Sequence, residues 1–188
     1  MSELFSIQLQ NRQQQGRDGV WLDLPTTTEQ VQAALRQIGI SSDNPQGLFI
    51  SGYFAEEEKR FAIPYNMVLA SNVDELNFLA ARLETLSAGE RAELNAALQA
   101  PQSELSSIGR ITDFPENVDY YVHLPDVHGP AQLGDYYLNR SGMVNMPEEW
   151  KGGIDTAQFG RYVAQQEQGV FTEYGYLVKS GDVGQKVH

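Results

Sequence analysis

The sequence predicts an α+β protein made of three consecutive small segments. Strand patterns surround one helix near the N-terminus, two strongly periodic helices follow, and the remainder mixes aromatic-rich strand patterns with helix patterns. These changes divide the chain into residues 1–66, a ββαβ-type N-terminal domain; residues 67–110, a helical middle domain; and residues 111–188, a mixed α+β C-terminal domain.

The N-terminal segment begins with two strand patterns, residues 4–9 and Val20–Leu24, separated by a polar turn that indicates a hairpin. Thr26 and Glu29 have the spacing of a capping box, and apolar residues at helical spacing follow them. The short apolar run Leu48–Phe54 is rich in β-forming residues. We therefore expect it to return to the same sheet.

The middle segment carries two helix patterns with clear N-terminal signals. Ser71 or Asn72 precedes a run in which the apolar residues of 73–86 share one helical face. Ser87-Ala88-Gly89-Glu90 repeats the capping-box spacing and predicts a second helix, which must stop near Pro101 because proline ends the hydrogen-bond pattern.

The C-terminal segment alternates between both kinds of pattern. An extended stretch covers residues 120–124, and helices are predicted from Ala131 to Asn139 and from Asp155 to Gln166. The β-like run Val170–Val178 follows.

Composition excludes whole classes of function. The 188 residues include 25 Asp and Glu against 13 Lys and Arg, and the net charge of −12 excludes a basic nucleic-acid binder. The absence of cysteine excludes disulfides, thiolate metal sites and a cysteine nucleophile. Without a long apolar run or a secretory signal, we expect a soluble cytoplasmic protein that does not enter membranes.

The negative charge is spread along the whole chain. The three segments carry −3, −3 and −6, and Asp113 to Glu149 contains seven acids and one base, Arg140. A solvated acidic surface that aids solubility explains such a pattern. The alternative is that spaced carboxylates imitate DNA phosphates, which present about one charge per ~1.7 Å of duplex.

One local cluster of acidic and histidine residues is a candidate for metal binding or for hydrolase chemistry. Asp119, His123, Asp126 and His128 lie close in sequence, but their spacing is not that of a helical zinc site. A small hydrolase using Asp119, His123 and His128 remains a rival interpretation. We predict no metal, no cofactor and no catalysed reaction.

Five local patterns, in this order, resemble the ArdA family of antirestriction proteins. They are Gly19-Val20-Trp21-Leu22-Asp23-Leu24-Pro25, Asp74-Glu75-Leu76-Asn77-Phe78-Leu79-Ala80, Gln132-Leu133-Gly134-Asp135-Tyr136-Tyr137, Phe159-Gly160-Arg161 and Phe171-Thr172-Glu173-Tyr174-Gly175-Tyr176. The resemblance extends over about residues 4 to 178.

This resemblance implies an elongated homodimer of three-domain chains, encoded on mobile genetic elements such as conjugative plasmids and transposons. Such a protein mimics bent B-form DNA and occupies the DNA groove of type I restriction-modification enzymes, at their methyltransferase core. It binds no nucleic acid itself. The implied acidic surface consists of Glu56, Glu57, Glu58, Asp74, Glu75, Glu84, Asp113, Glu116, Asp119, Asp126, Asp135, Glu148 and Glu149.

The family's antirestriction motif corresponds to residues 133–147 and is implied to lie in the dimer interface. The candidate interface residues are Leu133, Gly134, Tyr136, Tyr137, Met143, Val144 and Pro147. Leu133, Tyr136 and Tyr137 also have the i, i+3, i+4 spacing of an internal helix face. Gly52-Tyr53-Phe54 stands where family members often have Asp-Tyr-Glu, so two expected acids are missing from the first domain.

A different class of function also fits the composition. The chain is then an acidic adaptor that binds a basic or aromatic partner without imitating DNA, with aromatic residues of the third domain as contact anchors. Those anchors are Tyr120, Tyr121, Tyr136, Tyr137, Tyr174 and Tyr176. Competition with duplex DNA separates this adaptor from a mimic.

Overall fold

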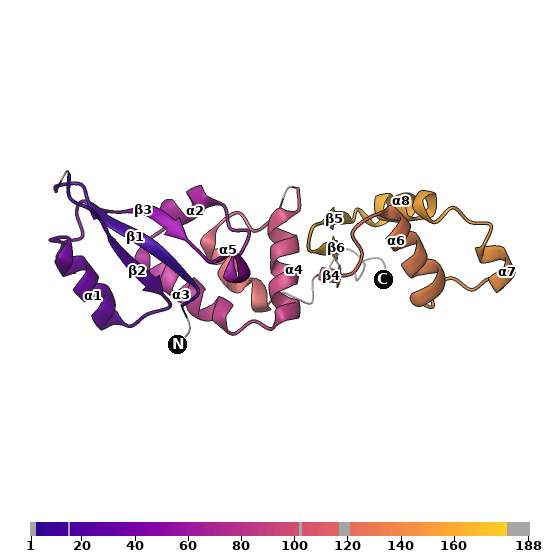
Figure 1. The fold of residues 1–188 in the computed structure, drawn as a ribbon, viewed down its shortest axis with the longest axis horizontal. Coiled ribbons are helices and arrows are strands. Elements are labelled where there is room, and N and C mark those ends of the chain that lie inside the picture. The colour runs from indigo at the N-terminus through magenta and orange to yellow at the C-terminus, as the bar shows by residue number, and fades with distance from the viewer. Residues whose placement is uncertain (1–2, 15, 102, 117–120, 180–188) are drawn as a thin grey trace, which may run out of the picture. The chain divides into compact units, whose positions relative to one another are not determined.

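A computed structural model describes residues 3–14, 16–101, 103–116 and 121–179 of the chain. It confirms the α+β class, with helices and two small antiparallel sheets (Figure 1). The chain forms two compact units: Met1–Leu86 with Glu104–Pro115, and Ser87–Ser103 with Glu116–His188. Unit 1 and unit 2 are used below for these two parts.

Unit 1 contains a sheet with strand order β2-β1-β3 and a set of mostly short helices. Its elements are β1 (Phe5–Asn11), β2 (Val20–Leu24), α1 (Thr28–Gln37), β3 (Leu48–Phe54), η1 (Glu57–Lys59), α2 (Tyr65–Leu69), α3 (Val73–Glu84) and α5 (Ile108–Asp113). The short helix η2 (Phe114–Glu116) begins in unit 1, and its last residue belongs to unit 2. Both strand pairs are antiparallel, and the predicted return of Leu48–Phe54 beside the first strand is confirmed.

Helix α1 begins one residue later than the capping-box spacing indicates. Thr27 is the N-cap, and its side chain accepts a hydrogen bond from the Gln30 N–H. Thr26 is held outside the helix, because its backbone N–H donates to Asn77 Oδ1 at 2.8 Å and its C=O accepts from Asn77 Nδ2 at 3.0 Å. The prediction of Thr26 as the cap was therefore wrong, and the residue instead ties the chain to α3.

Helix α3 agrees closely with its predicted pattern. Asn72 is its N-cap and accepts from the Glu75 N–H at 3.0 Å, while the Ser71 hydroxyl donates to the Glu75 carboxylate at 2.8 Å. The buried face of the helix contains Val73, Leu76, Leu79, Ala80 and Leu83. This face supplies much of the core of unit 1, together with apolar side chains of β1, β2 and α5.

The helices of residues 67–110 are divided between the two units. Helix α3 and helix α5 belong to unit 1, whereas α4 (Ala88–Gln99) belongs to unit 2, where it contacts β6. The predicted capping box of α4 is confirmed, since Ser87 and Glu90 exchange both hydrogen bonds. The three-domain division stays a prediction.

Unit 2 combines α4 with a second sheet of strand order β4-β6-β5. Its other elements are β4 (Tyr121–Leu124), α6 (Pro130–Asp135), the π-helix η4 (Tyr136–Arg140), α7 (Glu148–Lys151), α8 (Thr156–Glu167), β5 (Val170–Thr172) and β6 (Gly175–Lys179). The β-like run 170–178 is thus a hairpin whose turn precedes Gly175, which has φ of +117°.

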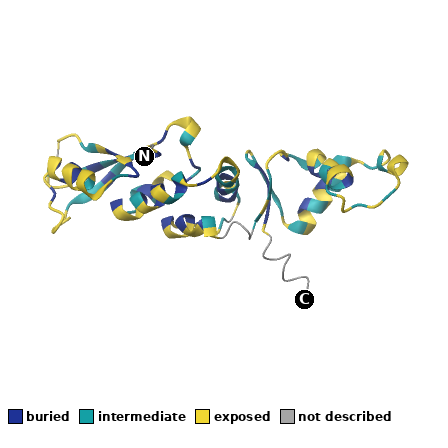
Figure 2. Cartoon of the chain, turned by 90° about the horizontal axis from the view of Figure 1, so that it is seen from below, coloured by how far each residue is buried: buried dark blue, intermediate teal, exposed yellow. Residues whose placement is uncertain are grey.

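The core of unit 2 lies between α6, α8 and the sheet. Buried Val127, Leu133, Ala164, Tyr176 and Val178 form one cluster, and half-buried aromatic residues pack around it. Figure 2 shows this burial as dark blue on the inward sides of the elements, with exposed residues on their outer sides. The predicted helix 131–139 is present, but its second half is a π-helix.

Candidate functional site

The predicted acidic residues lie almost entirely on the surface. Every described member of the set is exposed except Glu84, which is half-buried, and Asp119 lies outside the described residues. They occur in both units, so the charge does not gather in one pocket. These positions are physically available to a partner.

Some of these carboxylates have basic neighbours. Glu56 and Lys59 lie 3.3 Å apart, Asp135 and Arg140 3.8 Å, and Glu148 and Lys151 2.8 Å. Pairs between exposed side chains contribute about 0–1 kcal/mol. In the third pair the Lys151 side chain is only 14% exposed, whereas its partner Glu148 lies open to solvent. The pairs lower the local negative charge without removing the carboxylates from the surface.

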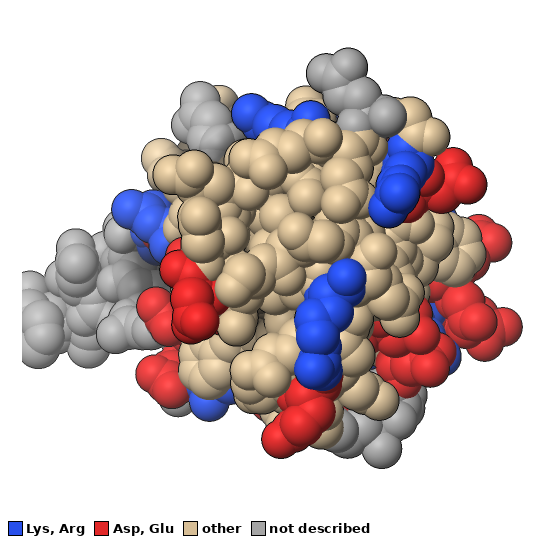
Figure 3. Space-filling model, turned by 90° about the vertical axis from the view of Figure 1, so that its left-hand side faces the viewer, with Lys and Arg blue, Asp and Glu red and all other residues tan. Residues whose placement is uncertain are grey.

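Local structure also explains part of the acidic pattern. Asp74 and Glu75 lie in the first turn of α3, where negative charge is favoured by the free N–H groups of the helix. Figure 3 shows one face of the molecule, on which acidic and basic side chains both surround a largely uncharged centre. Asp74 and Glu75 therefore have a role in the stability of α3.

The outer face of the first sheet is neutral where the family resemblance implies acids. Trp21, Gln8 and Gly52 lie side by side across β2, β1 and β3. A Cβ at position 52 would lie 3.1 Å from the Trp21 ring and 3.2 Å from Gln8 Cβ, so the ring uses the space that a side chain would need. Phe54, on the same strand, is 56% exposed.

The segment 133–147 begins inside the core of unit 2. Leu133 is fully buried, and Gly134 is buried where α6 crosses α8. A Cβ on Gly134 would lie 1.9 Å from the Thr156 carbonyl oxygen, and a Cβ on Gly160 would lie 1.7 Å from the Pro130 carbonyl oxygen. The two glycines therefore let the backbones of the helices touch, and Leu133 and Gly134 have an internal packing role.

The next part of the segment is fastened by a shared carboxylate. Glu167, at the end of α8, accepts hydrogen bonds from the Tyr137 and Tyr176 hydroxyls, the latter at 2.8 Å. Burial, and then the hydrogen bond to Glu167, raises the pKa of both tyrosines well above the ordinary value of 10. Glu167 thus joins the π-helix, α8 and β6.

Sequence reasoning missed Glu167. It lies at the end of a predicted helix among glutamines, and its two partners are 30 and nine residues away. A lone acid near a helix end gives no signal of such distant partners. Gly160, by contrast, lies inside one of the family-like patterns.

The end of the segment is open to solvent. Tyr136 packs edge-on against Tyr137 with ring centroids 5.4 Å apart, and the Arg140 guanidinium lies 5.5 Å from the Tyr136 ring centroid. Beyond the π-helix, Met143 is 76% exposed, Val144 is half-buried and Pro147 is exposed. The candidate interface residues therefore divide into a buried group and an accessible group.

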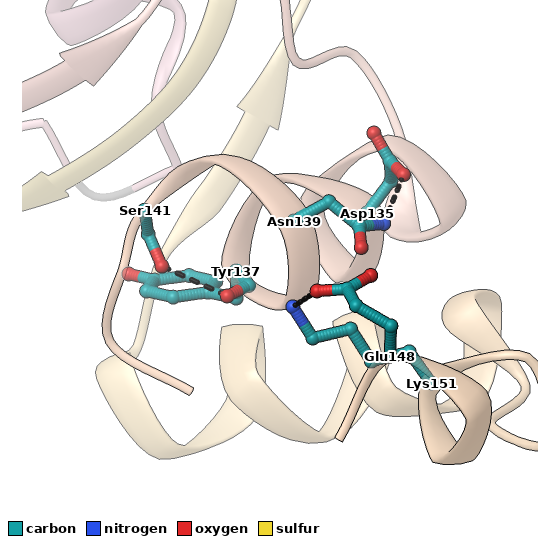
Figure 4. Close-up of polar contacts among 6 residues, drawn as sticks. All are labelled: Asp135, Tyr137, Asn139, Ser141, Glu148 and Lys151. Carbon is teal, nitrogen blue, oxygen red and sulfur yellow. Dashed lines mark hydrogen bonds and ion pairs between the residues drawn. The ribbon is translucent and has the colours of Figure 1, made fainter. Parts of the chain in front are cut away.

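Polar contacts hold the backbone around this accessible part (Figure 4). Asn139 Nδ2 donates to Asp135 Oδ1 at 2.8 Å, and the Ser141 hydroxyl donates to the Tyr137 carbonyl oxygen at 2.8 Å. Lys151 donates to Glu148 at 2.8 Å. Met143 therefore lies, along the chain, between two stretches that carry local polar contacts.

The two histidines of the hydrolase interpretation contact different backbone groups. His123 Nε2 lies 2.7 Å from the Tyr174 carbonyl oxygen, and His128 Nδ1 lies 3.4 Å from that of Thr172. Each ring nitrogen thus contacts backbone of the β5–β6 hairpin. Across the described parts of the chain, no three His, Asp or Glu side chains form a group that can hold a metal ion.

The tyrosines proposed as adaptor anchors are mostly internal. Tyr176 is fully buried, so it cannot be a contact anchor, and that expectation was wrong. Tyr121, Tyr136, Tyr137 and Tyr174 are half-buried, and Tyr120 lies outside the described residues. Within the described ranges, no helix is both long and apolar enough to span a membrane.

Comparison with known proteins gives a match over most of the chain. The family model described as "Antirestriction protein (ArdA)" matches residues 15–178. A search of curated proteins found no match. The matched range contains both sheets in part, the α6–α8 crossing and the whole of segment 133–147.

Proposed function

This chain belongs to the ArdA family of antirestriction proteins, and we propose that it inhibits type I restriction-modification enzymes by imitating B-form DNA. Its surface carboxylates occupy the groove of the methyltransferase core in place of DNA phosphates. The observation that carries the proposal is the exposure of the acidic residues throughout a chain of this family.

The charge distribution suits this mechanism better than it suits a single binding pocket. A duplex presents charge evenly along its length, so a mimic needs carboxylates on many elements. The exposed acids here come from η1, α3, α5, α6 and α7 and from the loops between them. The proposed elongated, three-domain arrangement would spread them over the length of a DNA site.

Binding would follow protein–DNA association with the roles exchanged. Lys and Arg of the enzyme that normally meet phosphates would meet Asp and Glu of this chain. Long-range attraction would raise the association rate, and salt would lower it because charges more than about 10 Å apart are screened at 0.1 M salt. The chain would catalyse no reaction, require no cofactor and bind no nucleic acid itself.

Dimerisation would extend the charged surface. Two copies would carry a net charge of −24, twice the −12 of one chain. We propose that the accessible part of segment 133–147, which includes the 76% exposed Met143, contributes the contact between copies. The protein would act in the cytoplasm, where an incoming mobile element meets restriction enzymes.

Matched substitutions test the role of charge. The variant Glu57→Gln, Glu58→Gln, Asp126→Asn and Glu149→Gln removes four exposed charges with little change in shape. The control Glu57→Asp, Glu58→Asp, Asp126→Glu and Glu149→Asp changes the shapes and keeps the charges. Inhibition of DNA cleavage by a type I enzyme is measured for both.

Distributed mimicry predicts that inhibition by the amide variant is at least about tenfold weaker than inhibition by the parent. Inhibition by the control variant should remain close to that of the parent. Each single amide change should have little effect. Equal inhibition by the parent and the amide variant contradicts the proposal, as does complete loss of inhibition from one single change. Circular dichroism verifies that each variant is folded.

A further inference from the structure

Strand β2 has an edge that its own sheet does not use. Among the described residues β2 pairs with β1 only. In an antiparallel pair, alternate N–H and C=O groups of an outer strand face away from the ladder. The strand contains neither proline nor lysine, which often protect such edges, and Asp23 is its one charged residue.

A groove of about 490 Å³ follows this edge. Four consecutive residues, Val20 to Asp23, line it. Side chains alternate between the two faces of a strand, so a groove on one face would contact only every second residue. Contact with all four residues therefore indicates that the groove lies along the edge of β2. The opposite wall is one face of α1, formed by Gln30, Ala33, Ala34 and Gln37.

The groove has a negative character. Glu3 and Asp23 line it, and no Lys or Arg is among its described lining residues. Asp23 accepts a hydrogen bond from the Ser6 hydroxyl at 2.5 Å, which fixes its position. Trp21, half exposed, adds an aromatic surface beside these carboxylates.

We propose that this groove binds an extended peptide segment of a partner protein, which carries Lys or Arg and adds a strand beside β2. Backbone hydrogen bonds to β2 would hold the segment, and Glu3 and Asp23 would select basic side chains. A second copy of this chain is a poorer occupant, because it would bring the same two carboxylates and a further charge of −12. The site is separate from the carboxylates proposed to imitate DNA.

A labelled peptide of about seven residues with alternating Lys and Val tests the proposal on the full chain. Fluorescence anisotropy compares it with the same peptide methylated on alternate backbone nitrogens, and with an alternating Glu and Val peptide. We expect the unmodified basic peptide to bind about tenfold tighter than either. Equal binding of the methylated peptide would show attraction to negative charge alone and overturn the proposal.

Two substitutions on neighbouring exposed positions of α1 locate the site. Ala33→Trp fills the groove and should weaken binding about tenfold, whereas Gln32→Trp lies outside it and should leave binding unchanged. Bound peptide should also slow hydrogen exchange of β2 amides. Unchanged binding to Ala33→Trp would refute the assignment.

These results are independent of antirestriction. A chain that fails to inhibit a type I enzyme can still bind the peptide, and a chain that inhibits can fail to bind it. The two proposals therefore stand or fall separately.

Discussion

Single residues decide how closely the helices of unit 2 approach each other. Gly134→Ala would place a methyl group 1.9 Å from the Thr156 carbonyl oxygen, which is backbone and cannot rotate away. Overpacking of this kind typically costs about 1–3 kcal/mol and occasionally more. We therefore expect the free energy of unfolding of unit 2 to fall by about 3 kcal/mol. Urea unfolding with hydrogen exchange of α8 measures the change.

Gly152→Ala is the matched control for this prediction. Gly152 has φ of −62°, and nothing lies within 4 Å of the Cβ position. Its substitution should change the free energy of unfolding by less than about 0.5 kcal/mol. Equal stabilities of the two alanine variants would show that α6 and α8 do not touch through their backbones.

The tyrosines that share Glu167 predict a pH dependence above neutrality. Their pKa values are raised in the folded chain, so the unfolded chain loses these protons first as the pH rises past about 10. Their contribution to stability is complete below pH 10 and declines above it. The double variant Tyr137→Phe and Tyr176→Phe should flatten this decline, measured by guanidinium unfolding between about pH 8 and 11.

An exposed tyrosine provides the comparison. Tyr65 is 50% exposed, and Tyr65→Phe should leave the alkaline decline as it is in the parent. A parent-like decline in the double variant would mean that the raised pKa values of these two hydroxyls are not its source. At pH 7, Tyr176→Phe alone should cost about 1–3 kcal/mol, since the half-buried Glu167 carboxylate loses one of its two tyrosine partners.

Among the helices and strands, the clearest local sequence signals predicted helix starts that the structure confirms. The Ser87–Glu90 box caps α4, and the backbone and side-chain hydrogen bonds from Ser87 hold the pKa of Glu90 below its ordinary value. Because the folded pKa is lowered, this contribution is present above pH 4.5 and is lost as the pH falls through the folded value.

The cap itself gives a measurable prediction. Ser87→Ala removes the side-chain acceptor for the Glu90 N–H and should destabilise the chain by about 1 kcal/mol. Ser87→Thr restores an acceptor and should recover most of the loss. Thermal unfolding monitored by circular dichroism compares the three proteins, and equal midpoints for parent and Ser87→Ala would contradict this role of the cap.

Elements without strong periodicity were missed for physical reasons. Helices α2, α5 and α7 have only five, six and four residues, too few for a repeating apolar face. The π-helix η4 was predicted as ordinary helix, because Leu133, Tyr136 and Tyr137 have α-helical spacing up to the point where the hydrogen bonds shift. Tertiary packing, which the local sequence does not contain, decides these cases.

The candidate site shows the same division between local and distant information. Exposure of the acidic residues follows from their charge, and family-like patterns identified the segment 133–147. The burial of Leu133 and Gly134 depends on α8, which lies more than twenty residues further along. The helical spacing of this segment was also compatible with a role in the core. The packing of Leu133 and Gly134 agrees with that role.

At the scale of the whole molecule, the proposed dimer gives the next prediction. Met143→Glu places a charge at the exposed point of segment 133–147 and should shift dimers toward monomers, because a charge is costly in a contact that excludes water. Phe78→Glu changes another exposed apolar residue, on α3, and should not. Sedimentation velocity over a range of concentrations measures the fraction of dimer for each variant. An unchanged fraction of dimer for Met143→Glu would show that this segment does not form the interface.

If this protein imitates DNA, the two must compete for one groove of the enzyme. The most direct measurement adds the purified chain to a type I methyltransferase bound to a fluorescent target duplex and records anisotropy at about 50 and 200 mM salt. Mimicry predicts release of the duplex, with more protein needed at the higher salt concentration. Binding of the chain to the enzyme while the duplex stays bound would contradict mimicry and favour an acidic adaptor.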